Sequence, residues 1–195
     1  MTAFTHETLS RDERYRGAIF TVRTDRVTMS GGGTASRDVV AAKGAVGVVA
    51  IDDVDRVVLI KQYRHAVGGY LWELPAGLRD ADGEPPLETA KRELAEEAGL
   101  SAERWSLLVT SYSTPGFCDE QVLIYLAEGL SDAERPEGFT AEHEETDMTV
   151  ARVPLDEAVG RVFTGGIRNA SAVIGLLAAA RARETSPSLR PVDAD

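Results

Sequence analysis

Three carboxylates crowd one short stretch of the chain: Glu93, Glu96 and Glu97 lie within five residues. On a helix, residues four apart share one side, so Glu93 and Glu97 are neighbours and Glu96 lies beside them. Like charges at this spacing repel, and acids in a last turn oppose the helix dipole, each at about a few tenths of a kcal/mol. A sequence that accepts such a cost usually does so at a functional site. Because Mg²⁺ prefers carboxylate oxygens, the pattern favours a divalent cation site over the alternative, a solvated acidic helix face.

The helix that must carry these acids is marked at both ends. Pro85 and Pro86 suit a first turn, where a missing N–H costs nothing, and Gly99 suits the residue just past the last turn. At about 100° per residue, one side of this helix is apolar. The residues of that side are Leu87, Ala90, Leu94 and Ala98. The glutamates are therefore expected at the edge of a buried surface.

The same stretch resembles a known motif. Residues 92–100 read Arg-Glu-Leu-Ala-Glu-Glu-Ala-Gly-Leu and match the R-E-U-x-E-E-x-G-U core of the Nudix box, where U is a bulky aliphatic residue. Glu84 stands eight residues before Arg92, as the motif requires. Six residues separate Gly77 from Glu84 where the motif has five, and we expect Gly83 to absorb the extra residue as a bulge.

The resemblance implies a role for each residue of the motif. Nudix enzymes hydrolyse a nucleoside diphosphate linked to another group, and cations neutralise the diphosphate and help to activate water. By resemblance, Glu93 and Glu97 are the principal ligands of Mg²⁺ or Mn²⁺, with Glu96 sharing the cation and the Ala76 carbonyl contributing. Arg92 resembles the residue that steers the glutamates, and we group it with Glu96 as catalytic. The alternative for Arg92 is a surface salt bridge, worth at most about 1 kcal/mol.

Segments outside the box resemble one branch of the family, the ADP-ribose pyrophosphatases, and its actinobacterial type above all. They are residues 62–64, 72–78, Pro115, residues 143–148 and residues 166–170. The resemblance covers nearly all of residues 37–180. It implies a small-molecule substrate, ADP-ribose, cleaved to AMP and ribose 5-phosphate.

The substrate-binding set follows from the same resemblance. Arg64 is expected to face a phosphate or the terminal ribose, because a planar guanidinium suits oxyanions. A surface arginine at a strand end is its alternative. Glu73 and Leu78 are expected to line the adenosine pocket. Arg37 and Glu145 complete the predicted set.

The general base is expected on a loop after the box. Only one such segment offers acids, and it reads Glu142-His143-Glu144-Glu145. Matching the following strand to the family pattern assigns the base to Glu144, with Glu145 as the second choice and Glu142 left open. A solvated acidic turn is the alternative for the whole segment.

Two other functions stay open. One is another Nudix substrate, either a nucleotide sugar such as GDP-mannose or a damaged nucleoside triphosphate. The other is a non-catalytic module that binds a ligand. Modules of that kind often have a degraded box and an added DNA-binding segment, and this chain has neither feature.

Composition limits the partners and the compartment. The net charge is −11, so nucleic acid and anionic membranes are poor partners. The single cysteine, Cys118, excludes an internal disulfide and fits a reducing compartment. The first 16 residues are polar, and no apolar run approaches the ~20 residues of a membrane span. We therefore expect a cytoplasmic protein.

Patterning predicts the elements around the box. Expected strands cover residues 18–27, 37–40, 45–51, 56–64, 70–74, 104–112, 121–128 and 147–153, and expected helices follow Pro154 and span residues 169–183. This order indicates an α/β (α+β) fold. The Nudix fold implied by the resemblance is a mixed sheet sandwiched between helices, here with a small N-terminal antiparallel β appendage.

Three regions follow along the chain. Residues 1–42 form an N-terminal β-hairpin region, residues 43–183 the Nudix hydrolase domain, and residues 184–195 a flexible tail. A lone hairpin is marginal in water, so this one must pack on its own domain or on a second subunit. Relatives of this branch exchange such a sheet between subunits, and the resemblance implies a homodimer.

Overall fold

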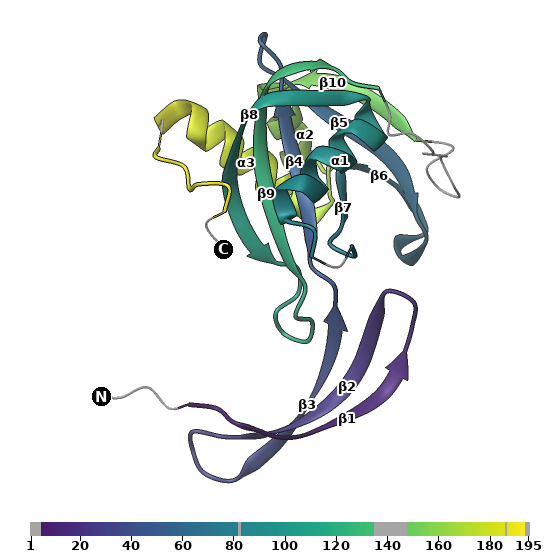
Figure 1. Ribbon diagram of the computed structural model, residues 1–195, viewed down its shortest axis with the longest axis vertical. Helices are drawn as coiled ribbons and strands as arrows, with labels where there is room; N and C mark the ends of the chain where they lie inside the picture. The colour runs from purple at the N-terminus through teal and green to yellow at the C-terminus, as the bar shows by residue number, and fades with distance from the viewer. Residues whose placement is uncertain (1–4, 82, 135–147, 186, 194–195) are drawn as a thin grey trace. The chain divides into compact units, whose positions relative to one another are not determined.

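The computed structural model describes residues 5–81, 83–134, 148–185 and 187–193 (Figure 1). The chain divides into two compact units. The smaller unit contains residues Met1–Gly44 together with Tyr112–Gln121, and the larger contains Ala45–Ser111 together with Val122–Asp195. The residues that resemble the Nudix box therefore lie within the larger unit.

The smaller unit is a three-stranded antiparallel sheet, in the order β1 (Thr8–Arg16), β2 (Phe20–Thr28) and β3 (Thr34–Ala42). The predicted hairpin is confirmed, because β2 and β3 pair without interruption from Phe20–Ala42 to Thr28–Thr34. The polar segment ahead of it was not predicted to be a strand. The sequence of β1 has no apolar alternation, and all nine of its residues are exposed. The strand is recognised in the structure by its backbone pairing with β2.

The larger unit is built on a mixed sheet with the order β10-β5-β4-β9-β8, with β6 paired to β5 and β7 paired to β4. Its strands are β4 (Ala45–Ile51), β5 (Arg56–Arg64), β6 (Gly69–Glu73), β7 (Ala76–Leu78), β8 (Leu100–Tyr112), β9 (Gln121–Asp132) and β10 (Thr149–Pro154). The central strand β4 runs parallel to β9 and antiparallel to β5 and β7. The predicted mixed sheet is confirmed.

Helices cover both faces of this sheet (Figure 1). They are α1 (Pro86–Ala98), α2 (Leu155–Phe163) and α3 (Ala170–Thr185), with a short 3₁₀ helix η1 (His65–Val67) between β5 and β6. Alternation along β4 sends Val46 and Val48 into the apolar cluster beneath α1, and Val49 into the cluster beneath α2 and α3. The sandwich predicted from the resemblance is therefore the observed architecture.

The C-terminal segment, for which composition predicts a flexible tail, contacts the larger unit at several residues. Leu189 and Val192 are partly buried against the two apolar clusters. The backbone amide of Leu107 donates to the carbonyl of Arg190 at 3.3 Å, and the Arg190 side chain donates to the Thr110 hydroxyl at 2.6 Å. The segment therefore satisfies one backbone amide of β8, the edge strand of the sheet. Within the described ranges, no helix has the length and apolar character needed to cross a membrane.

Candidate active site

The box helix α1 forms where the sequence predicts it. Pro85 precedes it in an extended conformation, and Gly99 ends it with φ 65°, a left-handed value that favours glycine. The predicted apolar side is confirmed, since Ala90 and Leu94 are fully buried and Leu87 and Ala98 pack against the same cluster. This packing fixes the helix, and so fixes the polar residues along its edge.

Arg92 gathers three carboxylates around one guanidinium. Its Nη1 donates to Oε1 of Glu93 at 2.8 Å and to Oε2 of Glu96 at 3.0 Å. Its Nη2 and Nε donate to the two oxygens of Glu84 at 3.3 and 3.4 Å. Burial opposes the charge of Arg92, but these contacts outweigh it and raise the pKa of the guanidinium. The predicted ion pair is therefore a partly buried network that sets the position of both Glu93 and Glu96.

Glu84 joins the start of the box to the helix. The hydroxyl of Thr89, a fully buried residue, donates to Glu84 at 2.8 Å. The hydrogen bond from Arg92, followed by that from Thr89, lowers the pKa of the Glu84 carboxyl and keeps it charged. Thr89 was missed in the sequence, and its position five residues after Glu84 is the signal that could have identified it.

Glu93 is held both by Arg92 and by packing on Gly77. Burial raises its pKa to about 7, Arg92 opposes that shift, and the charge of Glu96 adds to it. The side chain packs directly on Gly77, since a Cβ on that glycine would lie 2.7 Å from Cγ of Glu93 and would overlap its carboxylate. Gly77 is therefore required for close approach, which is the physical reason for a glycine at this position of the box.

Glu97 is buried, with 6% of its surface exposed, and it accepts a hydrogen bond from the backbone amide of Ala76 at 2.8 Å. A buried carboxylate needs such donors to stay charged. The contact brings residue 76 next to a predicted metal ligand. The role of the Ala76 carbonyl as a further ligand stays a prediction.

The donor set fits a hard divalent cation in its chemistry. Glu93, Glu96 and Glu97 offer carboxylate oxygens on one helix, and the buried Glu93 carboxylate is costly in its charged form, so a cation beside it would stabilise it. Among the described residues, no three acids, histidines or cysteines are grouped closely enough to enclose a metal ion. The hydrogen bonds explain this, because Glu93 and Glu96 accept from Arg92 whereas Glu97 accepts from the backbone amide of Ala76.

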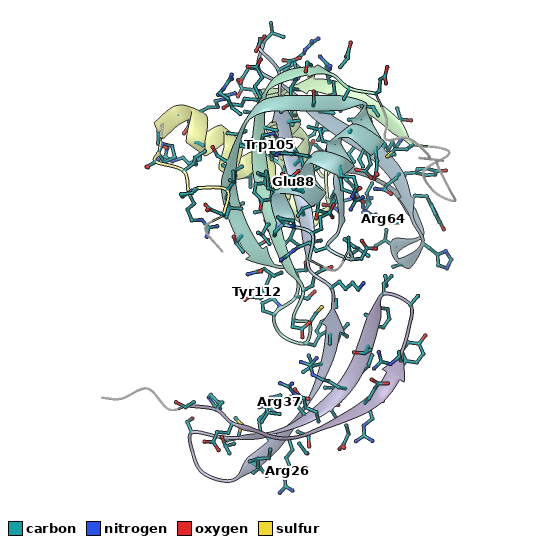
Figure 2. All side chains as sticks on the ribbon, viewed as in Figure 1. Arg26, Arg37, Arg64, Glu88, Trp105 and Tyr112 are labelled. Carbon is teal, nitrogen blue, oxygen red and sulfur yellow. The ribbon has the colours of Figure 1, made fainter. Side chains whose placement is uncertain are left out.

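Arg64 and Glu73 form another ion pair of the larger unit. Nε and Nη2 of Arg64 donate to the two carboxylate oxygens of Glu73 at 2.9 and 2.7 Å. Glu73 is buried, whereas 46% of the Arg64 side chain is exposed near the tip of the β5–β6 hairpin (Figure 2). Glu73 pairs across the strands with Ile60, and alternation puts both on the side of Val58, which packs beneath α1. This pair and the box therefore share one face of the sheet.

Of the other predicted substrate residues, Leu78 does not lie on that face of the larger unit's sheet. Leu78 pairs with Ala45, whose side chain packs against the α2–α3 cluster, so it alternates away from Gly77 and Glu93. Arg37 is exposed on β3 of the smaller unit, where it donates to the Ser36 carbonyl at 2.9 Å. The acids at positions 142, 144 and 145 lie outside the described residues, and their roles stay predictions.

Three comparisons bear on this site. The model of the NUDIX domain matches residues 42–172. An ADP-ribose pyrophosphatase of Mycobacterium tuberculosis (strain ATCC 25618 / H37Rv) is 48% identical over 189 residues, which are 97% of this chain and 90% of that protein. An ADP-ribose pyrophosphatase of Bacillus subtilis (strain 168) is 31% identical over 159 residues, which are 82% of this chain and 84% of that protein. A crystal structure of an ADP compounds hydrolase has a TM-score of 0.79 at 24% identity, over 95% of this chain and 98% of that one, and shows the same fold.

Proposed function

The chain belongs to the Nudix family, and from that premise we propose that it hydrolyses ADP-ribose to AMP and ribose 5-phosphate. The observation that carries this proposal is the Arg92 network, in which one guanidinium holds Glu84, Glu93 and Glu96. A solvated acidic helix face would leave these carboxylates exposed, whereas here they are ordered and largely buried. The similarity to ADP-ribose pyrophosphatases supports the choice of substrate.

Nudix hydrolases depend on divalent metal ions, and we propose Mg²⁺ or Mn²⁺ for this one. Glu93 and Glu97 would hold the cation, with Glu96 sharing it and the Ala76 carbonyl contributing. The bound cation supplies charge neutralisation at the diphosphate and activation of water. Arg92 keeps Glu93 and Glu96 in place, and the Ala76 amide keeps Glu97 in place.

The reaction itself is a hydrolysis. Water attacks a phosphorus of the diphosphate, the bond from that phosphorus to the bridging oxygen breaks, and the two phosphates leave as AMP and ribose 5-phosphate. We propose that Glu144 takes the proton from the attacking water, with Glu145 as the second choice. The proposal for this loop rests on resemblance.

Arg64 is proposed to bind a phosphate or the terminal ribose. Its two donors to Glu73 fix the guanidinium plane, so that little side-chain entropy is lost when the substrate is bound. Glu73, Leu78, Arg37 and Glu145 are also proposed to bind the substrate. The hydrogen bonds between Arg64 and Glu73 support the proposal that Glu73 belongs to this site.

A homodimer in the cytoplasm completes the proposal. The smaller unit carries large apolar side chains that are more than a third exposed, namely Leu9, Tyr15, Ile19 and Phe20. A second subunit is the partner expected to cover them. The single cysteine and the acidic charge are compatible with a reducing compartment.

The test is metal-dependent turnover across a small panel: ADP-ribose, GDP-mannose and nucleoside triphosphates. We expect kcat/KM to be highest for ADP-ribose, with AMP and ribose 5-phosphate as products, and activity to disappear with a chelator. Much faster turnover of GDP-mannose or of triphosphates would exclude this substrate. Tight binding of ADP-ribose without turnover in any cation would instead indicate a ligand-binding module.

A further inference from the structure

Thr89 brings a hydroxyl group into the buried side of the box helix. The residue is fully buried, as is its neighbour Ala90. Threonine favours a helix less than alanine does, and a buried hydroxyl costs free energy unless it is hydrogen-bonded. An alanine at position 89 would avoid both costs, so the hydroxyl group of Thr89 calls for a role of its own.

The acceptor of this hydroxyl is not the usual one for a threonine in a helix. Threonine side chains inside helices commonly donate to the carbonyl four residues earlier. That carbonyl belongs to Pro85 and lies 3.5 Å from Oγ1 of Thr89, at the limit for a hydrogen bond. Oε2 of Glu84, by contrast, lies at 2.8 Å. The hydroxyl therefore bonds chiefly to a carboxylate that lies before the helix, and a charged acceptor makes such a bond stronger.

Glu84 links this hydroxyl to the arginine of the box. Its two oxygens accept from Nη2 and Nε of Arg92 at 3.3 and 3.4 Å, both longer than the bond from Thr89. Arg92 in turn donates to Glu93 at 2.8 Å and to Glu96 at 3.0 Å. A continuous chain of hydrogen bonds therefore runs from the buried hydroxyl to two of the predicted metal ligands.

Thr89 is the most rigid member of this chain. The side chains of Arg92 and Glu84 are 32% and 22% exposed, and both are long. Ion pairs between partly exposed long side chains contribute little by themselves, because ordering both partners costs entropy. A β-branched side chain has few rotamers, and that of Thr89 is fully buried. Thr89 thus gives Glu84 a fixed donor that Arg92 alone does not provide.

We propose that Thr89 is a positioning residue of the metal site: its hydroxyl fixes Glu84, Glu84 orients Arg92, and Arg92 holds Glu93 and Glu96 for the cation. The inference rests on the proposed function, since it concerns the same site. Loss of a group that holds metal ligands typically lowers metal affinity or activity about 10- to 100-fold. Thr89 acts through two intervening residues, so we expect an effect at the lower end of this range.

Two substitutions separate the hydroxyl of Thr89 from its packing. Thr89→Val keeps the β-branched shape and removes the hydroxyl, and it should raise the Kd for Mn²⁺ about tenfold. The Mg²⁺ concentration that gives half-maximal activity should rise by a similar factor, and saturating Mg²⁺ should restore most of kcat. Thr89→Ser keeps the hydroxyl and removes a buried methyl group. It should lower Tm but leave the Kd for Mn²⁺ unchanged.

The experiment measures the Kd for Mn²⁺ by calorimetry without substrate, Tm without metal, and the Mg²⁺ dependence of ADP-ribose hydrolysis. The control is Thr185→Val, the same change at an exposed threonine of α3 whose hydroxyl donates to the Arg181 carbonyl at 2.8 Å. It should leave all metal-dependent quantities unchanged.

Glu84→Ala removes the other end of the same bond and gives a second, independent test. It should weaken Mn²⁺ binding at least as much as Thr89→Val does. Adding Thr89→Val to Glu84→Ala should then have little further effect, because residues of one network are not additive.

Three results would overturn the inference. They are wild-type Mn²⁺ affinity in Thr89→Val, wild-type affinity in Glu84→Ala, and an equal loss of affinity in Thr89→Ser and Thr89→Val, which would make packing responsible. Failure of the proposed function is distinct. A wild type that binds Mn²⁺ but does not hydrolyse ADP-ribose would refute that function, whereas the Mn²⁺ affinities of the variants would still decide the role of Thr89.

Discussion

Glu97 of the box helix accepts a hydrogen bond from the backbone amide of Ala76, 21 residues earlier in the chain, at 2.8 Å. The bond joins α1 to β7, and β7 is itself held against the central strand by the pairing of Ala76 with Gly47. A predicted metal ligand is thus tied to the most buried strand of the sheet.

We expect Glu97→Gln to lower kcat by about 10²–10⁴ at saturating Mg²⁺, because a metal ligand loses its charge. The glutamine carbonyl can still accept from Ala76, and one of several crowded charges is removed, so Tm without metal should stay equal or rise slightly. Enzyme kinetics and a thermal melt measure both. Glu88→Gln is the control on the same helix, since Glu88 is exposed and binds Lys91. Near-normal activity of Glu97→Gln would exclude Glu97 as a main ligand.

Gly77→Ala tests the close approach of the helix to β7. The added methyl group would overlap the Glu93 carboxylate, so Glu93 must move away from its position beside Arg92. We expect at least a tenfold loss of kcat/KM and a loss of stability of about 1–3 kcal/mol, as for other overpacked sites. The control is Gly160→Ala in α2, where a Cβ meets nothing within 4 Å. That change should raise helix stability by up to about 1 kcal/mol and leave activity unchanged.

Asp52 gives the larger unit a pH-dependent contribution to stability. Burial raises the pKa of its carboxyl, but hydrogen bonds from the Arg56 amide, the Arg56 side chain and the Val54 amide outweigh burial and lower it. A lowered pKa in the folded state stabilises the protein above the unfolded value, near pH 4, and that stability is lost as pH falls through the folded pKa.

We therefore expect Asp52→Asn to reduce the free energy of unfolding by about 1–2 kcal/mol at pH 7, and by progressively less as the pH falls below 4. Denaturant titrations at pH 7, 5 and 3.5 measure the difference from wild type. Asp53→Asn, an exposed neighbour, is the control and should change stability little at any pH. A difference that grows towards low pH would contradict this account.

The oligomeric state is a separate prediction. If the exposed apolar side chains of the smaller unit face a second subunit, light scattering at micromolar concentration should give twice the chain mass of 21.0 kDa. Phe20→Asp introduces a charge at one of these residues and should shift the protein towards monomer. A monomeric wild type would refute the dimer.

The box helix could be predicted closely from sequence, because its signals are local. Prolines mark its start, Gly99 marks its end, and the 3.6-residue period marks its buried side. The central strand β4 was equally clear, since its apolar run has the same bounds as the observed strand. Local propensity and tertiary packing agree in both elements.

Other features depend on contacts that spacing does not encode. β1 has no apolar side and is ordered by its neighbour, and the three residues of β7 are too few for a periodic signal. The raised pKa of Glu93 follows from burial by groups distant in sequence. The Nε of Arg79, which is buried and has no hydrogen-bond partner among the described residues, likewise depends on three-dimensional packing. The candidate acids could therefore be predicted from sequence, whereas the groups that surround and hold them could not.

The last prediction separates chemistry from binding. If Glu144 takes the proton of the attacking water, Glu144→Gln should lower kcat by about 10²–10⁴ with little change in KM, because a base acts only as the transition state forms. Added Mg²⁺ should not restore activity, whereas it should partly restore a weakened ligand such as Glu93→Asp. Glu145→Gln is the control on the same loop. Greater damage from Glu145→Gln would move the base by one residue. Mild effects from both would exclude both acids as the base, and the box glutamates would be tested next.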